Sequence, residues 1–164
     1  MGERADRAEA LFRAGCNCSQ SVFVAFADLY GIDEKTAMKL SASFGAGMGR
    51  MRETCGAFSG MLMVTGLETG AEESADQVQK GRNYEKVQEL AARFRADLGT
   101  LSCRELLGLT EEDVRHESVA PAPRTADYYE KRPCPRIIRR AAEILEETFD
   151  FPGVGDGTQC NMEE

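Results

Sequence analysis

The glycine-rich stretch ahead of Cys55 constrains the fold more than any other part of the chain. Gly45, Gly47 and Gly49 alternate with other residues in a segment that no regular helix or strand tolerates, and each glycine can adopt a positive φ angle. The run Gly56–Leu67 is apolar and contains neither proline nor charge, which predicts a buried helix. Cys55 therefore lies at a predicted helix N-terminus, where unpaired N–H groups and the helix dipole favour a thiolate.

The rest of the chain has helical periodicity and no strand pattern. Apolar residues recur at spacings of three and four, and no sustained alternation bounded by turns occurs. The predicted helices are Arg4–Ala14, Cys18–Tyr30, Glu34–Ser43, Gly56–Leu67, Asn83–Leu98, Arg104–Leu107, a short helix that opens at Thr110, and Arg136–Thr148, which Cys134 and Pro135 begin. We expect an all-α fold, an irregular bundle of about five to seven helices with cysteines at helix N-termini.

Two polar segments and the C-terminus are expected to lie outside the helices. The polar composition of Ala71–Lys80 predicts a surface connection. A loop is predicted for Val119–Pro135, which contains four of the five prolines. The length of 164 residues suits one domain with a core of its own. We therefore expect a single helical domain over residues 1–150 and a flexible, glycine-rich tail over residues 151–164.

Composition excludes several classes of function. The net charge of −8 argues against a nucleic-acid partner, because phosphate binding needs a basic face. No run approaches the roughly 20 apolar residues of a membrane span, and the N-terminus has no signal-peptide core, so we expect a cytoplasmic protein without membrane insertion. His116 is the only histidine, which excludes a zinc site built on three histidines. The composition is also compatible with a homodimer that forms through an apolar face.

Six cysteines are the main chemical feature of the sequence. Cys18, Cys55, Cys103 and Cys134 each lie at or just before a predicted helix start, so they converge if those helix ends face one cavity. In a reducing compartment such cysteines favour thiol chemistry or metal binding over a disulfide framework. Cys16 is interpreted as a packed cysteine at a helix junction.

Cys160 lies in the predicted tail and is expected to be peripheral.

The glycines before and after Cys55 permit two interpretations. Gly45, Gly47, Gly49 and Gly56 are candidate cofactor-binding positions, since backbone N–H groups there can donate to thiolates or sulfides; a tight connection between packed helices explains them equally well. Their pattern matches neither a dinucleotide fingerprint nor a P-loop.

Arg50 and Arg52 lie close to Cys55 in sequence. They are candidates for lowering the pKa of its thiol, or ordinary surface arginines.

Three segments together resemble the C_GCAxxG_C_C family of redox-active proteins. Cys55-Gly56-Ala57-Phe58-Ser59-Gly60 matches CGAxxG, Gly15–Val22 resembles GxNCxQxV, and Phe44–Gly49 resembles the family's glycine loop. The four cysteines that define the family map onto Cys18, Cys55, Cys103 and Cys134. Some family members carry selenocysteine, so the resemblance implies thiol redox chemistry, and it covers roughly residues 8 to 148.

Three hypotheses follow. In the first, the cysteines undergo dithiol–disulfide exchange or electron transfer with an unknown redox partner; Cys55 is the activated thiolate, Cys18 its partner, and Cys103 and Cys134 a second or resolving pair. In the second, the same four cysteines bind an iron–sulfur cluster or Zn²⁺. In the third, the protein is structural and its cysteines are inert.

Overall fold

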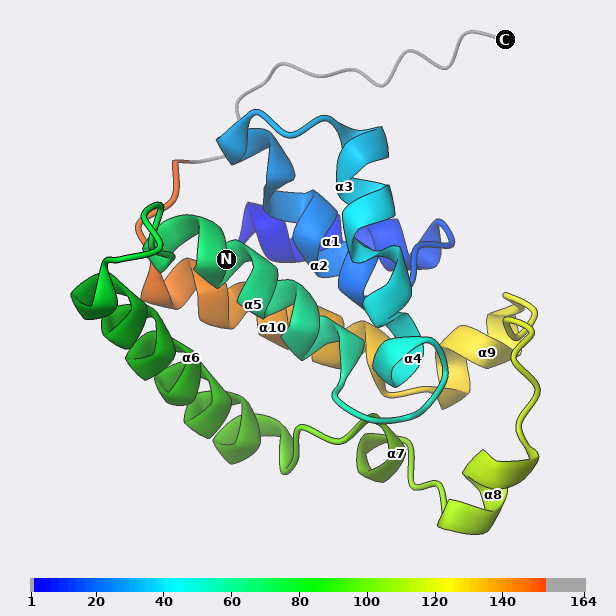
Figure 1. Cartoon of the computed structure of the whole chain (residues 1–164). Helices are drawn as coiled ribbons and strands as arrows, with labels where there is room; N and C mark the ends of the chain where they lie inside the picture. Colours follow the sequence, from blue (N-terminus) through cyan, green and yellow to red (C-terminus); the bar gives the residue numbers. More distant parts are fainter. Residues whose placement is uncertain (1, 153–164) are drawn as a thin grey trace, which may run out of the picture.

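The computed structural model describes residues 2–152, which form an all-α bundle (Figure 1). The α-helices are α1 (Glu3–Arg13), α2 (Cys18–Ala27), α3 (Glu34–Ser41), α4 (Gly45–Met48), α5 (Gly56–Thr69), α6 (Gln77–Leu98), α7 (Cys103–Leu106), α8 (Glu111–His116), α9 (Ala126–Lys131) and α10 (Cys134–Thr148). Two 3₁₀ turns, Asp28–Tyr30 and Ala42–Phe44, follow α2 and α3.

Helices α2 and α5 form the centre of the bundle because both are apolar on nearly every side. Eight of the ten residues of α2 are buried, among them Phe23 and Phe26. α5 packs along α2, while α1 and α10 cover α2 and each other. Phe58 of α5 meets Phe94 of α6 with ring centroids 5.4 Å apart, which fixes the long outer helix against the core.

The predicted fold class is confirmed. Six of the helices have eight or more residues, in agreement with the five to seven expected. Within residues 2–152 the only β-type pairing is an isolated antiparallel bridge between Thr54 and Ser102. Asn17 caps α2 through a full capping box, in which Asn17 Oδ1 accepts from the Gln20 amide and Gln20 Oε1 accepts from the Asn17 amide, both at 3.0 Å.

Two predicted connections were wrong in part. α6 begins at Gln77 and not at Asn83, because the Asp76 carboxylate accepts a hydrogen bond from the Gln79 amide at 2.8 Å and starts the helix six residues earlier. The expected loop Val119–Pro135 contains α9, which the Thr125 hydroxyl caps by accepting from the Tyr128 amide at 3.2 Å.

The end of the described chain returns to the core. The Phe151 ring packs against Phe26 with a centroid distance of 5.0 Å, although residue 151 was expected to begin the tail. Cys160 and the rest of that predicted tail, residues 153–164, lie outside the described residues. Among the helices that the structure describes, none combines the length and apolar character needed to cross a lipid bilayer.

The close crossing of α5 and α2 supplies a stability test. A methyl group at Gly60 would lie 2.9 Å from both Ser19 O and Val22 Cβ, whereas one at Gly66 of the same helix has nothing within 4 Å. Gly60→Ala should therefore lower the free energy of unfolding by roughly 1–3 kcal/mol through overpacking. Gly66→Ala should raise it by about 0.5–1 kcal/mol, because alanine favours the helix.

Urea denaturation of both variants measures this difference. Equal effects of the two substitutions would contradict the close packing described for Gly60.

Candidate functional site

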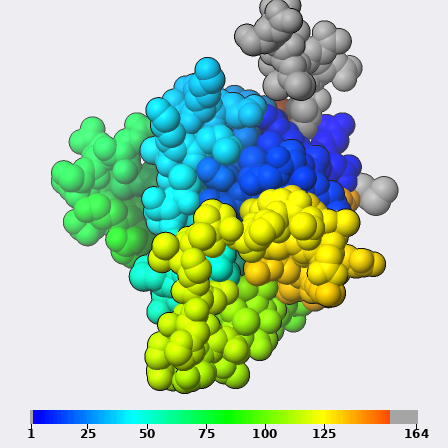
Figure 2. Space-filling model, turned by 90° about the vertical axis from the view of Figure 1, so that its right-hand side faces the viewer, coloured from blue at the N-terminus to red at the C-terminus, as the bar shows by residue number. Residues whose placement is uncertain are grey.

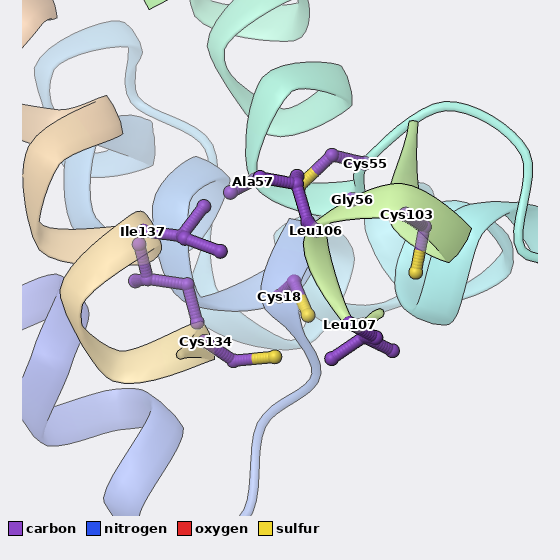
Figure 3. Close-up of a pocket in the computed structure, with 10 residues that line it drawn as sticks. Cys18, Cys55, Gly56, Ala57, Cys103, Leu106, Leu107, Cys134 and Ile137 are labelled. Atoms are coloured by element: carbon purple, nitrogen blue, oxygen red, sulfur yellow. The ribbon is translucent and has the colours of Figure 1, made fainter. Parts of the chain in front are cut away.

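Four cysteines from four helix starts line one small cavity (Figure 3). Cys18, Cys103 and Cys134 are the first residues of α2, α7 and α10, and Cys55 is the N-cap of α5. The cavity measures about 10 Å³, and its remaining lining is Gly56, Ala57, Leu106, Leu107, Ile137 and Ile138. It has room for about one water molecule and almost no polar wall, so the thiols are the only reactive groups facing it.

Cys55 is buried more deeply than its helix-start position suggested. Burial raises the pKa of the Cys55 thiol to about 12, and the helix N–H groups of Phe58 and Ala57 oppose this rise only in part. Desolvation of the charged form outweighs the helix end, which argues against the activation expected for this thiol. In the reduced structure Cys55 is a neutral thiol at physiological pH.

The Cys18 and Cys134 thiols interact directly, and their sulfur atoms face each other in Figure 3. The Cys18 thiol donates to the Cys134 sulfur, which lowers the pKa of Cys134 below its usual range and raises that of Cys18 well above it. Burial adds to the rise at Cys18, and the Arg132 guanidinium contributes to the lowered pKa of Cys134. The first proton to leave this pair therefore comes from Cys134.

A short backbone clip holds Cys55 beside the start of α7. The Cys55 amide donates to Leu101 O at 2.7 Å, and the Cys103 amide donates to Glu53 O at 2.7 Å. These bonds flank the bridge between Thr54 and Ser102. Two segments almost 50 positions apart in sequence thereby bring their cysteines to the same cavity.

The Arg52 side chain contacts Cys103 and not Cys55. Its Nη1 lies 3.8 Å from Cys103 Sγ, while its Nε and Nη2 bind the two carboxylate oxygens of Glu117 at 2.6 and 2.8 Å. Arg50 also turns to Glu117, at 3.5 Å. Burial still raises the pKa of Cys103, although the charge of Arg52 opposes that rise.

A left-handed turn directs these arginines. Ala46, Met48, Arg50 and Arg52 all have φ between 56° and 68°, and Gly47 and Gly49 are also left-handed. Left-handed backbone costs a non-glycine residue roughly 1–2 kcal/mol, so the surrounding contacts must hold the turn in place. The turn also affects the chemistry of the site, because the Ala46 backbone hydrogen-bonds to the Cys18 sulfur and opposes the rise in the pKa of Cys18.

The four candidate glycines lie around the site, and protein atoms account for three of them. An added methyl group would collide with the Asn17 side chain at Gly45, with Cys103 Cβ and the Arg52 backbone at Gly47, and with Phe44 O at Gly56. At Gly49 the nearest atom, Ser43 O, is 3.9 Å away, so only its positive φ favours glycine. Close packing explains these positions, and cofactor binding there stays a prediction.

A second, open cavity of about 250 Å³ adjoins the cysteines. Cys18, Cys103 and Cys134 contribute to its wall, whereas Cys55 does not. Its outer wall comes from the segment between α8 and α10, which lies beside the segment of α3 and α4 on the face seen in Figure 2 (lime and yellow beside cyan). A small molecule therefore reaches three of the four cysteines from this side.

Cys16 lines neither cavity. Its Sγ contacts Met38 Sδ at 3.7 Å, and the side chain is half-buried. This placement agrees with a packed cysteine at a helix junction.

Four thiolates are suitable ligands for zinc or an iron–sulfur cluster if their sulfur atoms are arranged around one point. Among residues 2–152, no group of three or more histidine, cysteine, aspartate or glutamate side chains is arranged to hold a metal ion. Metal binding by Cys18, Cys55, Cys103 and Cys134 would need their side chains to move from the positions described above.

Sequence reasoning missed three groups of the open cavity. Arg124, Tyr128 and Arg132 lie in or beside α9, inside the segment that was expected to be loop. The available signal was the cluster of basic and aromatic residues directly before Cys134, which the four flanking prolines obscured.

The order of ionisation can be tested on the reduced protein. Because a lower pKa means that the thiolate forms at lower pH, the first thiolate seen on raising the pH should belong to Cys134. We expect an ultraviolet thiolate titration whose first step disappears in Cys134→Ser and persists in Cys55→Ser. A first step that disappears in Cys55→Ser instead would contradict the assignment.

The left-handed turn supplies a paired test at its two glycines. Gly47→Ala combines strain at a φ of +69° with contacts of 2.6–2.8 Å, whereas Gly49→Ala adds only the strain at +62°. The second change should lower the free energy of unfolding by about 1 kcal/mol. The first should lower it by more than about 2 kcal/mol and speed alkylation of Cys103.

Chemical denaturation and peptide mass analysis after iodoacetamide treatment measure both effects. Equal losses of stability would show that Gly47 is not packed as described.

Comparisons with known proteins bear on this site. A family model described as "Putative redox-active protein (C_GCAxxG_C_C)" matches residues 16–148, a span that includes all four cysteines of the cavity. Neither the search of curated proteins nor that of solved structures found a match.

Proposed function

The chain belongs to the C_GCAxxG_C_C family of redox-active proteins, and on this premise we propose that Cys18 and Cys134 are its cycling dithiol–disulfide pair. The placement of their two sulfur atoms, which face each other in one small cavity (Figure 3), is the observation that carries this proposal, and the opposite pKa shifts of the two thiols agree with it. The pairing differs from Cys55 with Cys18, the one favoured by the sequence, because Cys55 is neutral and absent from the wall of the open cavity.

The proposed reaction begins with the Cys134 thiolate. It attacks one sulfur of a disulfide substrate, forms a mixed disulfide and releases the first substrate thiolate, which is protonated from water. Cys18 then loses its proton and attacks the Cys134 sulfur, which forms the Cys18–Cys134 disulfide and releases the second substrate thiolate. The substrate gains two electrons, and the protein dithiol loses them.

Groups around the pair have supporting roles in this proposal. Arg52, held by Glu117, keeps a positive charge 3.8 Å from Cys103, and Arg132 acts on Cys134. The Ala46 backbone bonded to Cys18 stabilises the negative charge that develops there during the second step.

A metal or iron–sulfur centre on the same four cysteines is the second candidate. It is favoured by one observation, that all four line a single cavity. Iron, sulfide and zinc analysis of anaerobically purified protein distinguishes it from the first candidate. A stoichiometric metal that is lost in each of the four Cys→Ser variants would favour this second function.

Single variants test the proposed cycle with bis(2-hydroxyethyl) disulfide, a small neutral substrate. Reduced wild-type protein should be oxidised with release of two thiols, and Cys134→Ser should lose this reaction by 100-fold or more, to order of magnitude, since the attacking thiolate is gone. Cys18→Ser should stop at a mixed disulfide on Cys134, detectable by intact mass.

Cys55→Ser is the matched control, because it removes another thiol of the same inner cavity. It should retain the reaction within about threefold, given the neutral state of Cys55. A Cys134→Ser protein that still consumes the disulfide at the wild-type rate would overturn the proposed cycle.

A further inference from the structure

The structure assigns a substrate class to the open cavity: we propose that it binds a low-molecular-mass disulfide carrying carboxylate groups, held by Arg124 and Arg132 beside Cys134. This inference rests on the proposed dithiol–disulfide function and specifies that the disulfide substrate is negatively charged.

The first argument is local charge. The whole chain has a net charge of −8, yet four arginines and no aspartate or glutamate line the open cavity. Glu117 neutralises part of this charge, because Arg52 binds it at 2.6 and 2.8 Å and Arg50 lies 3.5 Å from it. A positive cavity in an acidic protein attracts anions selectively.

The second argument concerns Arg124 and Arg132. Within residues 2–152 neither guanidinium forms an ion pair with a carboxylate, whereas Arg50 and Arg52 both do. Arg124 donates one hydrogen bond to Cys16 O at 3.2 Å, which leaves most of its N–H groups available. A guanidinium with free N–H groups binds a carboxylate through two parallel hydrogen bonds.

Aromatic rings hold both arginines in position. The guanidinium carbon of Arg124 lies 4.8 Å from the centre of the Tyr128 ring and 4.7 Å from that of Phe12, and the carbon of Arg132 lies 4.6 Å from the centre of the Tyr128 ring. Such stacking uses the faces of the guanidinium groups and leaves their N–H edges for a ligand. The two charges are therefore organised before a substrate arrives.

The third argument is position relative to the thiols. Arg132 is two residues from Cys134, and its charge acts on both Cys134 and Cys103. A carboxylate bound at Arg132 and Arg124 therefore lies in the same cavity as the attacking sulfur. The volume of about 250 Å³ admits a small molecule and excludes a folded protein domain.

Three disulfides with similar chain length and different charge test the inference: 3,3′-dithiodipropionate is anionic, bis(2-hydroxyethyl) disulfide is neutral, and cystamine is cationic. We expect reduced wild-type protein to react with the anionic compound ~10-fold or more faster than with the neutral one at low salt, and slowest with cystamine. Added salt should reduce this preference, since screening weakens the attraction.

Substitution isolates the contribution of the arginines. In Arg124→Gln/Arg132→Gln the ratio of the anionic to the neutral rate should fall to about one third of its wild-type value or less. The ratio is the readout, because a changed thiolate population at Cys134 alters all three rates together. Arg82→Gln/Arg95→Gln, which removes the same two positive charges from exposed positions of α6, should keep the wild-type ratio.

The outcomes separate the two proposals. If no disulfide oxidises the Cys18–Cys134 pair, the proposed function fails. If all three compounds react at charge-independent rates, or the double variant keeps the wild-type ratio, the function stands and the substrate inference is overturned. Should the double variant fail to fold, Arg132→Gln and the salt dependence of the wild-type ratio decide the same question.

Discussion

The crossing of α5 over α2 fixes the position of the cysteine site. Gly56 has no side chain, and the Cβ it lacks would lie 3.1 Å from Cys18 Cβ and 3.2 Å from Gly45 Cα. This close approach brings the start of α2, the start of α5 and the left-handed turn to one point. The clip between Glu53–Cys55 and Leu101–Cys103 then adds α7, and α10 closes the cavity with Cys134. A larger residue at Gly56 would separate the elements that carry the thiols.

Burial and charge act in opposite directions on these thiols, and their balance differs from one to the next. Desolvation dominates at Cys55, which lines the small inner cavity and not the open one. At Cys103 the charge of Arg52 opposes the effect of burial on the pKa without overcoming it. Only Cys134 has a lowered pKa, because the Cys18 thiol donates to it and Arg132 is close. Four chemically identical side chains therefore receive distinct roles from their surroundings.

The sequence was sufficient for the helix starts and insufficient for the chemistry within the cavity. Asn17 before Cys18 and Ser102 before Cys103 are local capping signals, so the positions of these cysteines could be predicted. The depth of Cys55 could not, since it depends on how α5, α7 and α10 pack. The orientation of the Arg52 side chain toward Cys103 could not be predicted either, because a left-handed turn with non-glycine residues has no reliable local sequence signal. α9 was missed since its few residues lie among prolines.

Peptide mapping of the oxidised wild-type protein tests the central claim most directly. The reduced protein would be treated with a mild disulfide oxidant, alkylated without reduction, digested and analysed by mass spectrometry. The account predicts one intramolecular disulfide, between Cys18 and Cys134, with Cys55 and Cys103 alkylated only after unfolding. A disulfide that links Cys55 to any of the other cysteines, with Cys134 left free, would contradict it.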